Sequence, residues 1–214
     1  DEGLITFLPK KVEKALAEDE NYVPMHKIID KYNSFSGSRY DLPLITPADQ
    51  QTLFTYRFLS YTKPAVALYF LRDYLGEDLF YNTLHKFIQR WHGKHPTSYD
   101  FFYTFNDITE ENLSWFWSPW FFEFSYSDLS IKEVSGNKVT IENIGGIPLP
   151  IYLTVIYSDD TEEIIEEKMD IWKNRTRIYK IETSKSDIKE IKLGTDLIPD
   201  TDKNNNIYIV NKEA

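Results

Sequence analysis

Two patterns of hydrophobic and polar positions follow one another along the chain. In residues 61–91 the apolar side chains recur three and four positions apart, at Tyr61, Pro64, Ala65, Leu68, Leu71 and Leu75, and then at Leu79, Phe80, Leu84, Phe87, Ile88 and Trp91. That spacing predicts two α-helices, each with one apolar face, separated by Gly76. Thr62 is the expected N-cap of the first helix, with Pro64 in its first turn. Shorter helices are expected around residues 98–105 and 110–122.

From about residue 129 the period of the pattern changes to two. Apolar and polar residues alternate in residues 129–132, 139–141 and 151–155, and β-branched side chains are frequent. Alternation of this kind is typical of strands that bury one face. Turn-forming stretches, such as Gly145-Gly146, separate about six or seven such runs. The pattern favours a small β-sandwich.

The distribution of aromatic residues changes at the same place. All 14 phenylalanines precede residue 128, and the aromatic residues that follow it are Tyr152, Tyr157, Trp172, Tyr179 and Tyr208. We therefore expect an α+β protein with two domains. Residues 1–126 would form the helical domain and residues 127–214 the β-sandwich domain.

Charge and cysteine content narrow the range of functions. The net charge is −10, from 24 basic and 34 acidic residues, and no Lys/Arg cluster is dense enough to bind a row of phosphates, which argues against a nucleic-acid partner. The lack of cysteine excludes disulfides, thiolate metal sites and a cysteine nucleophile. No apolar run approaches the roughly 18 residues of a membrane span. Because the chain opens on Asp1, without Met or a leader pattern, we expect an upstream part in the intact protein.

Two residues stand out as candidates for chemistry, although the residues alone leave both open. Glu2 precedes an apolar, helix-like run, where a first-turn carboxylate is favoured by the helix dipole even without any function. Tyr61 stands directly before a predicted helix, where a tyrosine usually belongs to the core. A phenol keeps its proton at neutral pH, so Tyr61 could instead donate a hydrogen bond to a developing oxyanion.

Several segments, in a consistent order, resemble the aminopeptidase N family of zinc peptidases, which are gluzincins. Asp1-Glu2-Gly3-Leu4 resembles the acidic-Glu-Gly-apolar motif of this family, and Tyr61-Thr62-Lys63-Pro64-Ala65 resembles its Tyr-x-Lys-Gly/Pro-Ala motif. Residues 75–80, 96–102 and 112–120 resemble the helices that follow, and residues 142–150 and 200–206 are similar to the tail of bacterial members. The chain thus resembles the C-terminal part of such a metallopeptidase.

This resemblance implies a role for each candidate residue. Glu2 would be the third zinc ligand, and an HExxH helix upstream of Asp1 would supply two histidine ligands and the general base. Tyr61 matches the tyrosine that donates to the tetrahedral intermediate. The implied substrate is a peptide that loses its N-terminal residues, and the implied location is the periplasm or cell surface. With one ligand of three, the chain alone is expected to be inactive and to bind no zinc tightly.

The chain departs from the family pattern in two ways. Pro9 follows Leu4 by five residues and lacks a backbone N–H, so the helix that begins at Glu2 should be short or kinked. The Gly-x-Met-Glu-Asn motif, which holds the substrate amine in this family, does not occur in the chain. Preference for N-terminal residues is therefore implied by the family alone.

Two other functions compete with the peptidase interpretation. The chain could belong to a non-catalytic interaction or scaffold protein that kept a peptidase-like fold and lost its metal, and only the upstream sequence separates that case from an enzyme. It could also bind carbohydrate through exposed aromatic residues at 115–122. The peptidase interpretation instead predicts that Trp115 and Trp120 are mostly buried.

Residues near the C-terminus partly resemble a calcium-binding loop. Asp200, Asp202 and Asn204 repeat at two-residue intervals, but the sixth and twelfth positions are Asn205 and Asn211, where a calcium loop has Gly and Glu. We expect a solvated turn here.

Overall fold

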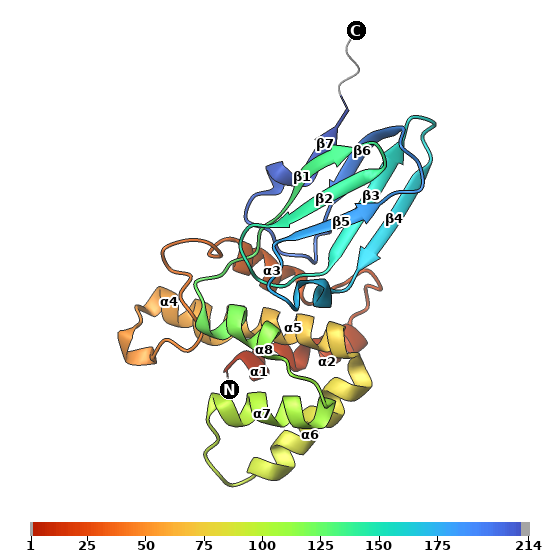
Figure 1. Cartoon of the computed structure of the whole chain (residues 1–214). Coiled ribbons are helices and arrows are strands. Elements are labelled where there is room, and N and C mark those ends of the chain that lie inside the picture. The colour runs from red at the N-terminus through yellow and green to blue at the C-terminus, as the bar shows by residue number, and fades with distance from the viewer. Residues whose placement is uncertain (1, 211–214) are drawn as a thin grey trace.

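The computed structural model describes residues 2–210 and contains helices followed by two antiparallel sheets (Figure 1). We call residues 2–122 the helical region. It comprises α1 (Glu2–Phe7), α2 (Pro9–Leu16), α3 (His26–Asn33), η1 (Ala48–Gln50), α4 (Leu53–Arg57), η2 (Phe58–Thr62), α5 (Lys63–Leu75), α6 (Glu77–Trp91), α7 (Ser98–Thr109), α8 (Ser114–Trp117) and η3 (Ser118–Phe122). The mixed α+β fold class is confirmed. Asp1 lies outside the described residues.

A single helical run, from Leu53 to Leu75, lies at the centre of the helical region. It joins α4, the π-helical turn η2 and α5 without a break, and the Thr52 side chain caps its start by accepting a hydrogen bond from the Thr55 N–H. The predicted N-cap at Thr62 is therefore wrong, because Thr62 has helical dihedral angles and is buried inside the run. The wide turn η2 ends two residues before Pro64, whose ring would clash with the carbonyl four residues earlier in a regular α-helix.

The other predicted helices form with small differences in length. Gly76, at φ 80°, ends α5 and precedes α6, as its place between the two apolar runs predicts. The expected short helix at Glu2 is also confirmed, since α1 ends at Phe7 and α2 begins at Pro9, a first-turn position where proline is tolerated. Both α1 and α3 pack on α5, whose buried face includes Val66, Phe70 and Leu71.

We call residues 129–209 the strand region. It holds β1 (Leu129–Ser135), β2 (Lys138–Asn143), β3 (Ile151–Tyr157), β4 (Glu162–Glu167), β5 (Ile178–Glu182), β6 (Ile188–Leu193) and β7 (Ile207–Ile209), with short turns η4 (Met169–Trp172) and η5 (Lys203–Asn206). The sheet orders are β1-β2-β5 and β4-β3-β6-β7. Strict alternation along β3 buries Leu153 and Val155, and Val155 faces Ile191 across the β3–β6 pair. The period of two therefore gives each sheet a buried face.

The two regions meet through a short connection and several side chains. Tyr126 pairs with Gly146, and a Cβ at Gly145 would lie only 2.1 Å from the Tyr126 carbonyl oxygen, so only glycine permits this approach. Lys173 of the strand region forms an ion pair with Glu111 of the helical region at 2.8 Å.

The predicted domain division at residue 126 falls in the connection between the two regions and stays a prediction. Among residues 2–210, no helix is long and apolar enough to cross a membrane.

Candidate active site

The fold brings the two candidate residues into one neighbourhood. Glu2 opens α1 and Tyr61 lies in η2, and both side chains are half-buried. The helix α1 packs directly against η2 and the start of α5. Tyr56, on α4, touches both candidates and links them. Segments that are distant in sequence therefore share one site.

Contact between the two motifs explains the glycine in the first. A Cβ at Gly3 would lie 2.6 Å from Pro64 Cβ and 2.7 Å from Pro64 Cγ. Such distances do not occur between carbon atoms that are not bonded, so a larger residue would push α1 away from α5. The glycine of one motif and the proline of the other thus set how closely Glu2 approaches the helical run.

The π-helical turn η2 decides which tyrosines share a face. In a regular α-helix two residues five positions apart differ by about 140° around the axis. A π-helix bonds residues five apart, as when the Lys63 N–H donates to the Phe58 carbonyl, so five residues complete about one turn. Tyr56 and Tyr61 consequently lie on the same side, with ring centroids 6.2 Å apart in an edge-to-face contact.

Tyr56 joins the candidate site, although no motif in the sequence pointed to it. Its hydroxyl donates to Glu2 Oε1 at 3.4 Å. The negative charge of Glu2, followed by the neighbouring Tyr61 hydroxyl, raises the pKa of Tyr56 above its usual value. The phenol therefore stays protonated and able to donate. The sequence does show a second tyrosine five positions before Tyr61, but only the π-helical turn brings the two onto the same face.

Lys63, the lysine of the second motif, has a different role from the tyrosines. Its Nζ forms an ion pair with Asp41 at 2.6 Å, with the two side chains 0% and 2% exposed, and also donates to the carbonyls of Leu42 and Ser125. Burial lowers the pKa of the Lys63 ammonium, while the Asp41 carboxylate acts in the opposite direction. Because Asp41 also accepts from the Gly37 N–H, the pair ties the start of α5 to residues 37–42 and to the connection at Ser125.

The described residues include the candidate zinc ligand Glu2 but no complete metal site. Among residues 2–210, no three His, Cys, Asp or Glu side chains lie close enough together to hold a metal ion. Glu2 offers carboxylate oxygens, a donor type that zinc accepts, beside two phenol groups. Glu2 could therefore serve as one metal ligand, and the remaining ligands would have to come from outside these residues.

The aromatic cluster near residue 117 is mainly core. Trp120 is 0% exposed and Trp117 is 4% exposed, which confirms the predicted burial of Trp120. Trp115 is half-buried, with its ring against Tyr74 at 5.2 Å and the Lys173 ammonium above it at 5.5 Å. These rings pack against protein and do not form the open platform that sugar binding through this cluster would need.

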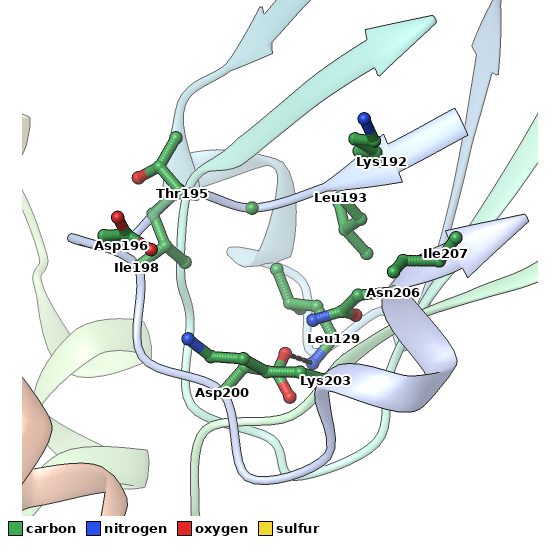
Figure 2. A pocket seen from close by; sticks show the side chains of 11 residues that line it. Leu129, Lys192, Leu193, Thr195, Asp196, Ile198, Asp200, Lys203, Asn206 and Ile207 are labelled. Carbon is green, nitrogen blue, oxygen red and sulfur yellow. Dashed lines mark hydrogen bonds between the residues drawn. The ribbon is translucent and has the colours of Figure 1, made fainter. Parts of the chain in front are cut away.

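A hollow of about 200 Å³ lies in the strand region, between β6 and η5 (Figure 2). The prediction of a solvated turn at residues 200–204 is wrong for Asp200, which is 7% exposed and accepts hydrogen bonds from the backbone N–H groups of Leu129 and Asp202. Burial raises the pKa of Asp200. This carboxylate fastens the segment before η5 to β1, and Asn211, the twelfth position of the loop pattern, lies outside the described residues.

Comparisons with known proteins bear on the family and the fold of the chain. The family model of the peptidase family M1 domain matches residues 2–120. A search of curated proteins finds no match. Among solved structures, the crystal structure of Legionella pneumophila aminopeptidase A in complex with aspartic acid is similar, with a TM-score of 0.61 and 14% sequence identity. The match covers 92% of this chain and 23% of the Legionella chain, so the likeness shows a shared fold over about a quarter of that protein.

Proposed function

The chain belongs to peptidase family M1, and we propose that its helical region contributes Glu2 and Tyr61 to the active site of a longer zinc aminopeptidase. Membership supports a peptidase function in general, and peptidases of this family depend on zinc. The observation that carries the proposal is the convergence of Glu2 and Tyr61 on Tyr56, which places a carboxylate and two phenols in one site.

Each proposed role follows from the chemistry of the group. Glu2 provides one carboxylate ligand, and two histidines outside the described residues provide the others. When bound, zinc supplies an activated water for attack on the peptide carbonyl. The Tyr61 hydroxyl donates a hydrogen bond to the oxygen on which negative charge develops and so stabilises it. The substrate is a peptide, and removal of N-terminal residues is the expected specificity.

The isolated chain should lack both tight zinc binding and peptidase activity. A catalytic zinc site needs three protein ligands and an open fourth position, whereas Glu2 is one ligand. The chain alone should therefore bind no stoichiometric zinc and hydrolyse no peptide. Activity would require the whole protein.

The decisive experiment uses the full-length protein that contains this chain. Tyr61→Phe should lower kcat for an aminoacyl substrate by about 10²–10³ with zinc content unchanged, because one oxyanion donor is lost. Tyr69→Phe, at a half-buried tyrosine further along α5, should leave kcat within about twofold of the unaltered protein, because Tyr69 lies outside the proposed site. Glu2→Gln should release zinc.

Other results would select a different function. Normal turnover by the Tyr61→Phe protein would remove the proposed role of Tyr61. A full-length protein that folds but neither binds zinc nor hydrolyses peptides would be a scaffold or interaction protein that retains the peptidase fold.

A further inference from the structure

We propose that Tyr56 is a positioning residue that holds the Glu2 carboxylate in its working orientation. The inference rests on the proposed function, because it concerns how the ligand Glu2 is kept in place. The Tyr56 hydroxyl donates to Glu2 Oε1 at 3.4 Å, and the Tyr56 ring contacts the Tyr61 ring. One side chain therefore adjoins both the proposed ligand and the proposed donor.

A glutamate at the start of a short helix needs such a partner. Glu2 is the first residue of α1, which spans six residues, and its side chain has several rotatable bonds. A carboxylate that can adopt several rotamers must be ordered when it binds a metal, and ordering costs entropy. A hydrogen bond from a fixed neighbour reduces that cost, and for this reason the partners of metal ligands affect metal affinity.

Tyr56 is itself held firmly enough to serve as that neighbour. It follows Thr55 and stands two residues before Phe58, which are 3% and 1% exposed, in the continuous helical run of α4, η2 and α5. Two features set its distance from Glu2. The π-helical turn places Tyr56 on the face of Tyr61, and the contact of Gly3 with Pro64 brings α1 to that face.

The hydroxyl group can be tested separately from the ring. Tyr56→Phe removes the donor to Glu2 but keeps the aromatic contact with Tyr61, so a role limited to packing predicts no change. Tyr74→Phe is a matched control, because the Tyr74 hydroxyl also donates to a glutamate, Glu111, at 3.0 Å, in a different part of the helical region. Thermal unfolding and circular dichroism establish that each variant is folded.

The measurement is the affinity of the full-length protein for zinc ions, determined by competition with a chelator of known affinity. Tyr56→Phe should bind zinc about 10-fold more weakly, whereas Tyr74→Phe should match the unaltered protein. At saturating zinc, kcat of Tyr56→Phe should fall much less than kcat of Tyr61→Phe, because Tyr56 positions a ligand and Tyr61 contacts the reacting oxygen.

The possible outcomes separate the inference from the proposed function. Zinc binding by the unaltered protein, with unchanged affinity in Tyr56→Phe, would overturn the inference and leave the proposed function standing. Equal weakening in Tyr56→Phe and Tyr74→Phe would also overturn it, since the loss would then reflect general destabilisation. No zinc binding by the unaltered full-length protein would overturn both.

Discussion

The helical region buries an ion pair, whereas the strand region carries its ion pairs at the surface. The side chains of Lys63 and Asp41 are 0% and 2% exposed. In the strand region, Lys185 and Asp159 are 43% and 51% exposed, and the pair of Lys189 with Asp160 is more exposed still. A buried ion pair stabilises the fold only if its two groups are well placed to hydrogen-bond each other, because each group loses its hydration. An exposed ion pair contributes little to stability, so its residues can change at little cost.

The two regions differ in how much of their packing the pattern of apolar residues determines. Along β3 a simple alternation of side chains already determines which residues face the core. In the helical region α1, the π-helical turn and residues 37–42 must pack against one another, and periodicity does not specify how these segments are positioned. We infer that the buried Lys63–Asp41 pair and the Gly3–Pro64 contact fix their relative positions next to the candidate site.

The largest expected effect is on stability, from Lys63→Met. The substitution leaves the Asp41 carboxylate buried without its cation, and should lower the free energy of unfolding by about 3–5 kcal/mol. The matched variant in the strand region, Lys185→Met, should lower it by at most about 1 kcal/mol. Urea denaturation followed by circular dichroism measures both.

A double variant sharpens the same test. Lys63→Met with Asp41→Leu removes both charges and should recover much of the lost stability, since no charge is then buried without a partner. If Lys63→Met and Lys185→Met destabilised the protein equally, the contrast between the regions would have no energetic basis.

The next effect in size concerns the contact between the two motifs. Gly3→Ala forces α1 away from Pro64 and should cost about 1–3 kcal/mol of stability, with a loss of kcat in the full-length protein because Glu2 moves from Tyr56. Gly194→Ala is the control in the strand region. Gly194 has φ 88° and no atom near its added Cβ, so its cost of about 1 kcal/mol arises from the backbone and should leave kcat unchanged. Equal kcat values for the two variants would argue against a link between this contact and the site.

The smallest expected effect is at the junction of the two regions. Burial alone would raise the pKa of Glu111, but hydrogen bonds from Lys173, Tyr74 and Trp115 outweigh it and hold the pKa below its usual value. Ionised Glu111 therefore stabilises the fold above its unfolded pKa of about 4.3, and this contribution is lost as the pH falls through the lower folded pKa.

Replacement of Lys173 tests this contribution. Lys173→Met should cost no more than about 1 kcal/mol at pH 7, because both side chains are partly exposed. It should also make stability less sensitive to acid in the range below about pH 4.3. Melting temperatures of both proteins between pH 3 and 7 measure the difference, and parallel curves would show that Lys173 does not influence Glu111.

Much of the fold could be predicted from the sequence, because local periodicity reflects local structure. The helices on either side of Gly76, the short helix that ends before Pro9, and the run of strands after residue 129 all follow from spacing and from backbone preferences. The N-cap assigned to Thr62 failed because the π-helical turn continues the helix through that residue. The solvated turn at Asp200 failed because its partner, the Leu129 N–H, is distant in sequence.

The sequence by itself determined the α+β class and the family, and it made Glu2 and Tyr61 the candidates for the site, because these rest on short motifs and on periods of two and of three to four residues. Only the tertiary structure decided that Tyr56 belongs with them, that Lys63 is buried against Asp41, and that Gly3 lies against Pro64. The physical reason is that these contacts join segments that are distant along the chain. The pattern within a segment says which of its faces is apolar, but not which partner that face meets.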